Sequence, residues 1–129
     1  MPLKSQLSVM VVDDMSVSRG LIEQALDWAE IKKVQYEADG QTALRKLVAA
    51  PVHLVISDFN MPGMDGLTLL ENLRSNKSTQ RIGFILVTGT ANREMIQRGK
   101  AAGMNNFIAK PFTKEALLRC IELVTGKLQ

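Results

Sequence analysis

Apolar residues in this chain fall into short runs, separated by stretches with helical spacing. Four of the runs show almost no alternation with polar residues: 9–12, 53–56, 84–87 and 107–109. Such runs are typical of parallel strands that are covered on both faces. A fifth run, 33–37, alternates apolar and polar residues, which indicates an edge strand with one solvated face.

The stretch after the first run predicts an amphipathic helix. Val17, Leu21, Ala25 and Trp28 recur at intervals of four, four and three residues, so the helix extends to about residue 29. Ser16 stands immediately before this pattern and is predicted to be the N-cap.

Four more helices are predicted from the same signals and their boundary residues. They cover 43–48 with Pro51 as the stop, 67–73 with Asp65 as the N-cap, 91–102 with Gly103 as the stop, and a segment capped by Thr113. The helix over 91–102 has a thin apolar stripe, made by Met95, Ile96 and a few alanines. Because weak burial lowers local stability, we expect this helix to move most easily.

The alternation of five strands with five helices defines the fold class. It predicts an α/β protein with one parallel sheet, right-handed crossovers and helices on both faces. The 129 residues contain no linker or repeat, so we expect a single domain over 1–129.

Polar residues follow four of the predicted strands. Asp13 and Asp14 follow the first strand, Asp58 the third, Thr88 the fourth and Lys110 the fifth. The carboxyl ends of parallel strands meet at one edge of the sheet, where ligands of open α/β sheets bind. Asp58 alone could be a turn residue or a helix N-cap. The Asp13-Asp14 pair at the end of a second strand favours a functional site.

Three carboxylates at one edge repel one another unless a cation lies among them. Oxygen ligands with no His or Cys nearby are typical of Mg²⁺ sites, which leave room for phosphate oxygens. Lys110 adds a positive charge and Thr88 a hydroxyl donor. These groups favour phosphoryl transfer to a carboxylate, with Asp58 as the best candidate nucleophile.

Composition and charge limit the other function classes. The net charge of +3 is uneven, because residues 1–90 carry nine Lys/Arg against ten Asp/Glu and residues 91–129 seven against three. Solvated helix surfaces are the simpler explanation of this basic excess, and no basic stripe indicates nucleic-acid binding. No apolar run approaches the about 18 residues of a membrane span, residues 1–5 carry no signal peptide, and the single Cys120 cannot form an internal disulfide. We expect a cytoplasmic monomer with no nucleic-acid or membrane partner.

Taken together, several motifs resemble a known family. They are Asp13-Asp14, the segment 57–66, Val87-Thr88 and Lys110-Pro111-Phe112. Over about 9–124 the chain resembles the receiver domains of response regulators of the CheY type. The resemblance implies a flavodoxin-like sheet with the strand order 2-1-3-4-5.

The resemblance also implies a role for each matching residue. Asp58 would accept a phosphoryl group from a histidine kinase of the CheA type. Mg²⁺ would be held by Asp13, Asp14, Asp58 and the backbone carbonyl of Asn60. The phosphoryl group would be contacted or sensed by Lys110, Thr88, Gly89 and Phe107, and the Lys110-Pro111 bond would be cis.

The chain departs from the best-known members of the family at a few positions. Phe107 stands where those members have Tyr, so it can swing inward but offers no hydroxyl to a partner. Thr90 stands where a charged residue is frequent, and Phe59 replaces a Trp often found beside the phosphorylated Asp. These departures leave the hydrolysis rate and the choice of partner open. Without the resemblance, Phe107 could equally be a core residue.

The resemblance implies a stand-alone signalling switch rather than an enzyme, and we expect no output domain after Gln129. Phosphorylation would change the surface of the last two helices and the strand between them, with the candidate partner contacts Thr90, Met95, Arg98, Phe107, Lys114 and Arg119. The flagellar motor switch is the leading partner. A phosphate sink or phosphorelay carrier without an output of its own is the alternative.

A hydrolase with an aspartyl-phosphate intermediate is a third possibility from a different class. Haloacid-dehalogenase-like phosphatases need a second Asp two residues after the nucleophile, at the end of the first strand. The sequence Asp13-Asp14-Met15-Ser16 lacks that arrangement.

Overall fold

The computed structural model describes residues 6–126, so the N-terminal segment 1–5 discussed above lies outside the described residues. Within this range one parallel sheet has the order β2-β1-β3-β4-β5. Its strands are β1 (Ser8–Val12), β2 (Lys33–Glu37), β3 (Leu54–Asp58), β4 (Gly83–Thr88) and β5 (Asn106–Ala109). The helices are α1 (Ser16–Trp28), α2 (Gly40–Ala49), α3 (Gly66–Arg74), α4 (Arg93–Ala102) and α5 (Lys114–Thr125). The predicted fold class and strand order are confirmed.

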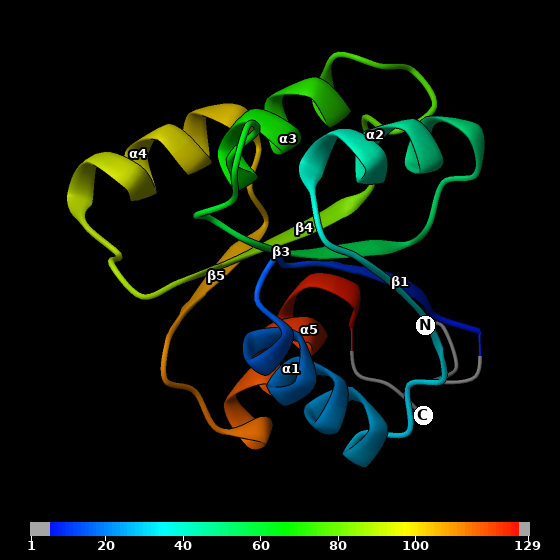
Figure 1. Ribbon diagram of the computed structural model, residues 1–129, viewed down its shortest axis with the longest axis vertical. Coiled ribbons are helices and arrows are strands. Elements are labelled where there is room, and N and C mark those ends of the chain that lie inside the picture. The colour runs from blue at the N-terminus through cyan, green and yellow to red at the C-terminus, as the bar shows by residue number, and fades with distance from the viewer. Residues whose placement is uncertain (1–5, 127–129) are drawn as a thin grey trace.

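The sheet separates two layers of helices. Figure 1 shows α1 and α5 on one face and α2, α3 and α4 on the other. Along β3, Leu54 and Ile56 pack into the cluster on the α1–α5 side, and Val55 packs into the cluster on the other side. Because both faces are covered, the middle residues of the central strands are apolar in succession, which explains the lack of alternation in the sequence.

Strand β2 lies at one edge of the sheet, as predicted. Among the residues that the structure describes, its only strand partner is β1, with Lys33 opposite Ser8 and Glu37 opposite Val12. No residue of β2 is fully buried. The alternating pattern of this run therefore matches a strand with one solvated face.

Helix α1 buries a different stripe from the predicted one. Val17, Leu21 and Trp28 are 74%, 55% and 44% exposed, and of the predicted stripe only Ala25 is buried. The buried face is formed by Ile22, Ala25, Leu26 and Ala29. Both stripes have helical spacing, so the pattern alone did not distinguish them.

The predicted N-cap of α1 is also wrong. Ser16 is the first residue of the helix, and Met15 occupies the N-cap position without a side-chain cap. The other predicted caps are confirmed. Asp65 accepts a hydrogen bond from the Thr68 amide at the start of α3, and Thr113 accepts one at the start of α5.

Helix α4 begins at Arg93, two residues later than predicted. Asn92 is its N-cap and accepts a hydrogen bond from the Met95 amide at 2.8 Å. Gly103 ends the helix in the left-handed region, with φ of 93°, as expected for a glycine stop. None of the described helices has the length and apolar character needed to cross a membrane.

Candidate functional site

The sheet register places the acidic residues side by side. Val12 of β1 is paired with Ser57 of β3, so the residues that follow them, Asp13 and Asp58, are neighbours at the carboxyl edge. Carboxylate oxygens of Asp13, Asp14 and Asp58 all lie within 4.8 Å of one another. The predicted acidic cluster therefore exists in the folded chain.

The Asp13-Asp14 pair presents oxygens that lack a partner. Asp13 is fully buried, its Oδ1 accepts a hydrogen bond from the Met15 amide at 2.9 Å, and Arg19 donates to its backbone carbonyl at 2.7 Å. Within residues 6–126, the buried side-chain polar atoms without a hydrogen-bond partner are Asp13 Oδ2 and Asp14 Oδ1. Buried oxygens in this state are costly, and an all-oxygen set fits a hard divalent cation such as Mg²⁺.

Asp58 forms an ion pair with Lys110. Lys110 Nζ lies 3.1 Å from Asp58 Oδ1, and the two side chains are 29% and 7% exposed. Burial raises the pKa of the Asp58 carboxyl, and the charge of Asp13 adds to this, while the hydrogen bond from Lys110 opposes it. A cation among the carboxylates would favour the charged form of Asp58, because it would offset both burial and the repulsion from Asp13.

Strands β4 and β5 supply the remaining polar groups of the site. The Thr88 hydroxyl is buried and accepts a hydrogen bond from the Thr90 amide at 3.1 Å. The Thr88 carbonyl accepts one from the Lys110 amide at 2.8 Å, which fixes the end of β5 beside β4. A Cβ on Gly89 would have no atom within 4 Å, so this side of the site is open. The Lys110-Pro111 peptide bond is cis, as expected.

The loop after Asp58 folds back tightly against its own strand. The Gly66 amide donates to the Phe59 carbonyl at 2.9 Å, which closes a loop that carries the exposed Asn60. A Cβ on Gly66 would overlap the backbone carbonyl of Asp58 and would touch Leu86 at 2.9 Å. The absence of a side chain at Gly66 therefore allows the loop to pack this closely against the Asp58 carbonyl.

Two contributors to the site were not identified from the sequence. Gly66 belongs to the motif 57–66, but its role was not predicted, because that role depends on how closely the loop returns to Asp58. Arg19 donates to a backbone carbonyl, that of Asp13, and no sequence pattern identifies such a partner.

The predicted partner surface is only partly assembled. Thr90 and Arg119 are exposed and Phe107 is half-buried. Met95 is 8% exposed and belongs to the core on the α2–α3–α4 side. A partner therefore cannot contact Met95 in this arrangement.

Two further candidates of that surface are engaged elsewhere. Lys114 lies over the ring of Trp28, 4.9 Å from its centroid, and so faces α1. Arg98 makes its polar contacts with residues of α3 and its N-cap. The six predicted contacts thus do not form one continuous exposed face.

Apolar surface lies next to the site. The exposed stripe of α1 and the segment after β5 border a groove of about 440 Å³, lined by Met15, Val17, Leu21, Phe112 and also by Lys110. Because Lys110 also pairs with Asp58, the groove borders the acidic cluster.

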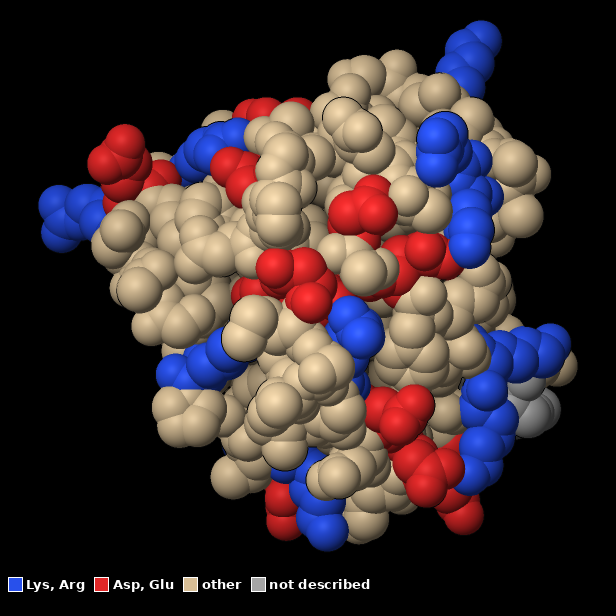
Figure 2. Space-filling view, viewed as in Figure 1, with Lys and Arg blue, Asp and Glu red and all other residues tan. Residues whose placement is uncertain are grey.

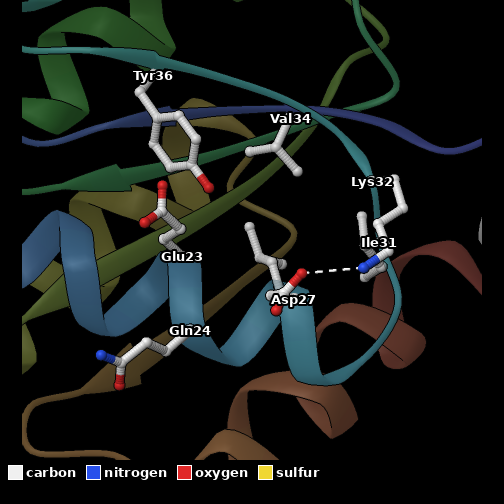
Figure 3. Close-up of a pocket in the computed structure, with 8 residues that line it drawn as sticks. Glu23, Gln24, Asp27, Ile31, Lys32, Val34 and Tyr36 are labelled. Atoms are coloured by element: carbon white, nitrogen blue, oxygen red, sulfur yellow. Dashed lines mark hydrogen bonds and ion pairs between the residues drawn. The ribbon is translucent and has the colours of Figure 1, made fainter.

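A separate cavity of about 390 Å³ lies between α1 and β2 (Figure 3) and includes none of the clustered aspartates. In Figure 3 the Tyr36 hydroxyl points toward Glu23, and Asp27 is paired with Lys32. Burial, with the charges of Glu23 and Asp27, raises the pKa of Tyr36 to about 12. The cavity therefore holds a neutral phenol beside carboxylates.

Charged side chains of both signs are scattered over the face of the molecule that Figure 2 shows, which is otherwise mostly uncharged. Acidic groups gather near its middle, between the two layers of helices, and basic groups lie around them.

One protein family matches most of the chain. The family model for the response regulator receiver domain matches residues 9–122 of this sequence. The chain therefore belongs to this family. A probable chemotaxis protein CheY of Rhizobium etli is 40% identical over 129 residues, which is 100% of both chains.

Solved structures of similar proteins share this fold. Chemotaxis protein CheY4 of Vibrio cholerae is 32% identical, with a TM-score of 0.86 over 93% of this chain and 99% of that one. The receiver domain of a Pseudomonas aeruginosa sensor histidine kinase is 26% identical, with a TM-score of 0.85 over 95% and 100% of the two chains. That structure has a magnesium ion coordinated in its active-site cleft. The protein is therefore a receiver domain of the CheY type, a signalling component of two-component systems.

Proposed function

We propose that Asp58 is phosphorylated by a histidine kinase in a reaction that depends on Mg²⁺, and that the phosphorylated protein binds a partner through its α4–β5–α5 side. The observation that carries this proposal is the arrangement of Asp58, with Lys110 at 3.1 Å and two unpaired buried carboxylate oxygens nearby. The leading partner is the flagellar motor switch, in keeping with the chemotaxis relatives.

Each group of the site has a role in this reaction. Asp13 and Asp14 would hold the metal ion with their unpaired oxygens, together with Asp58 and the carbonyl of Asn60. When bound, Mg²⁺ supplies positive charge that offsets the carboxylates and the phosphoryl oxygens. An oxygen of Asp58 attacks the phosphorus of a phosphohistidine, and an O–P bond forms as the N–P bond breaks. The electron pair of the broken bond returns to the imidazole nitrogen, while Lys110 pairs with the phosphoryl oxygens.

Phosphorylation would then be sensed by Thr88. Its hydroxyl is held by the Thr90 amide at 3.1 Å, so turning toward a phosphoryl group exchanges this bond for a charge-assisted one. The half-buried Phe107 would follow into the space that Thr88 leaves. A full conversion between two arrangements takes about 5 kcal/mol of differential stabilisation, which a few charge-assisted hydrogen bonds can supply.

The groove beside Lys110 supports a protein donor. Asp58 is 5% exposed, so a phosphohistidine must come close to the edge of the sheet to reach it. Met15, Val17 and Leu21 offer apolar contact area at the same edge.

Intact-mass measurement tests the chemistry. With acetyl phosphate and Mg²⁺, the wild-type protein should gain the mass of one phosphoryl group, and no gain should occur when EDTA is present from the start of the reaction. Asp58→Asn should gain nothing. Asp39→Asn is the matched control, because Asp39 is an N-cap outside the site, and it should gain the group as wild type does. A phosphoryl group on Asp58→Asn, or none on wild type, would refute the proposal.

Partner binding is tested separately. Beryllofluoride with Mg²⁺ mimics the acyl phosphate, and a peptide of the motor switch should bind this form more tightly than the metal-bound protein alone. Equal affinity would favour the phosphate sink.

A further inference from the structure

Helix α4 is attached to α3 through one arginine near its middle. Arg98 Nη1 lies 3.4 Å from Asp65 Oδ2, and Nη2 lies 3.3 Å from Glu71 Oε1 and 3.2 Å from Thr68 Oγ1. The contact with Glu71, joined by the charge of Asp65, raises the pKa of the Arg98 guanidinium, so it stays charged. One side chain of α4 therefore contacts the N-cap of α3 and two residues along that helix. Figure 1 shows the two helices next to each other in one layer.

The first part of α4 makes few apolar contacts with the rest of the described chain. Its buried residues are Met95 and Gly99. A cavity of about 220 Å³, bordered by Phe59, Leu67 and Asn92, separates this part of the helix from the loop after β3. The Arg98 contacts thus span a region where apolar packing is incomplete.

The far end of α4 is fixed in a different way. Arg74 of α3 donates to the carbonyl of Gly103 at 2.9 Å from Nη2 and to Asn105 Oδ1 at 3.1 Å. It also donates to the carbonyl of Ile82 at 2.7 Å, so the same side chain connects the end of α4 to the residue before β4. The C-terminal end of α4 can therefore act as a pivot, while the N-terminal part depends on Arg98.

The Arg98 contacts also reach the loop of the site. Asp65, which Arg98 contacts, is the N-cap of α3 and directly precedes Gly66, whose amide closes the loop that follows Asp58. A shift of α4 away from α3 must break these contacts, and a change in the loop alters their geometry.

We propose that Arg98 is a positioning residue that restrains α4 in the arrangement seen here and so opposes conversion to the phosphorylated arrangement. This inference rests on the proposed function of Asp58. Because the three contacts are partly exposed, we expect the restraint to be modest, and its loss should tighten binding of a phosphoryl mimic about threefold to tenfold. The side chain thereby sets how readily the protein responds, without touching the phosphoryl group.

Titration with beryllofluoride at saturating Mg²⁺ tests the proposal, with amide chemical shifts near residues 58 and 110 as the readout. Arg98→Gln should lower the half-saturating concentration about threefold to tenfold. Arg93→Gln is the matched control, because it removes the same charge from an exposed position of the same helix, and it should leave the value unchanged. Glu71→Gln removes one contact and should shift the value in the same direction by less. Arg98→Lys keeps the charge and should restore part of the wild-type value.

Hydrogen exchange of the metal-free protein separates this proposal from the function of Asp58. Arg98→Gln should speed exchange of the α4 amides about threefold to tenfold, and Arg93→Gln should not. Unchanged or weaker beryllofluoride binding by Arg98→Gln would overturn the proposal, as would unchanged α4 exchange. If wild type fails to bind beryllofluoride, the proposed function of Asp58 is wrong, and no role of Arg98 in the response remains.

Discussion

Helices α3 and α4 are neighbours of nearly equal length that are held in the fold by different forces. Helix α3 has five buried residues in nine, among them Leu67, Leu70 and Leu73. Helix α4 has two in ten, Met95 and Gly99. Polar contacts add to this packing, through Arg98 of α4 and through Arg74 of α3.

The difference indicates which part of the molecule can change. Truncating a buried leucine lowers the free energy of unfolding by several kcal/mol. A partly exposed ion pair contributes less than about 1 kcal/mol to the same quantity. Helix α3 follows directly on the loop that leaves Asp58 and keeps that loop in place. We therefore expect α4, rather than α3, to be the helix that the proposed phosphorylation of Asp58 repositions.

The largest expected effect comes from the apolar side of this comparison. Leu70→Ala removes a fully buried side chain of α3 and should lower the free energy of unfolding by about 2–5 kcal/mol. Ile96→Ala, at a half-buried position of α4, should cost about 1 kcal/mol or less. Urea unfolding followed by circular dichroism measures both. Similar losses for the two variants would mean that α4 is packed as firmly as α3.

A smaller effect is expected at the start of α3. Gly66→Ala places a methyl group against the Asp58 carbonyl and should lower the free energy of unfolding by about 1–3 kcal/mol. Gly89→Ala makes the same change where the space is open and should alter stability by less than about 0.5 kcal/mol. Thermal unfolding of the two metal-free variants measures both changes in stability. If Gly66→Ala is as stable as Gly89→Ala, the loop can relax around the added methyl group and the prediction is wrong.

The smallest effect concerns the caps. Asn92→Ala removes the N-cap of α4 and should destabilise that helix by about 1 kcal/mol. We expect faster hydrogen exchange in α4 with little change in global unfolding, because α4 opens on its own. Thr113→Ala, the equivalent change in α5, should instead lower global stability by about 1 kcal/mol. The comparison would be contradicted if Asn92→Ala lowered global stability as much as Thr113→Ala.

Much of the candidate site could be predicted because its residues follow strands directly. An apolar run marks a buried strand, and parallel strands align their carboxyl ends, so Asp13, Asp58 and Lys110 had to lie at one edge. What could not be predicted involves contacts between side chain and backbone, such as Arg19 with the Asp13 carbonyl. Such contacts depend on distances between elements, which leave no periodic signal.

The sequence by itself determined the order of the elements, the N-caps Asp65 and Thr113, and the acidic edge, because these depend on neighbours a few residues apart. Only the tertiary structure decided which stripe of α1 is buried, since Leu21 and Ile22 both belong to stripes with helical spacing. It also decided that Arg98 contacts α3. A long side chain reaches whatever the packing of two helices brings within a few ångströms, and that packing is a property of the whole fold.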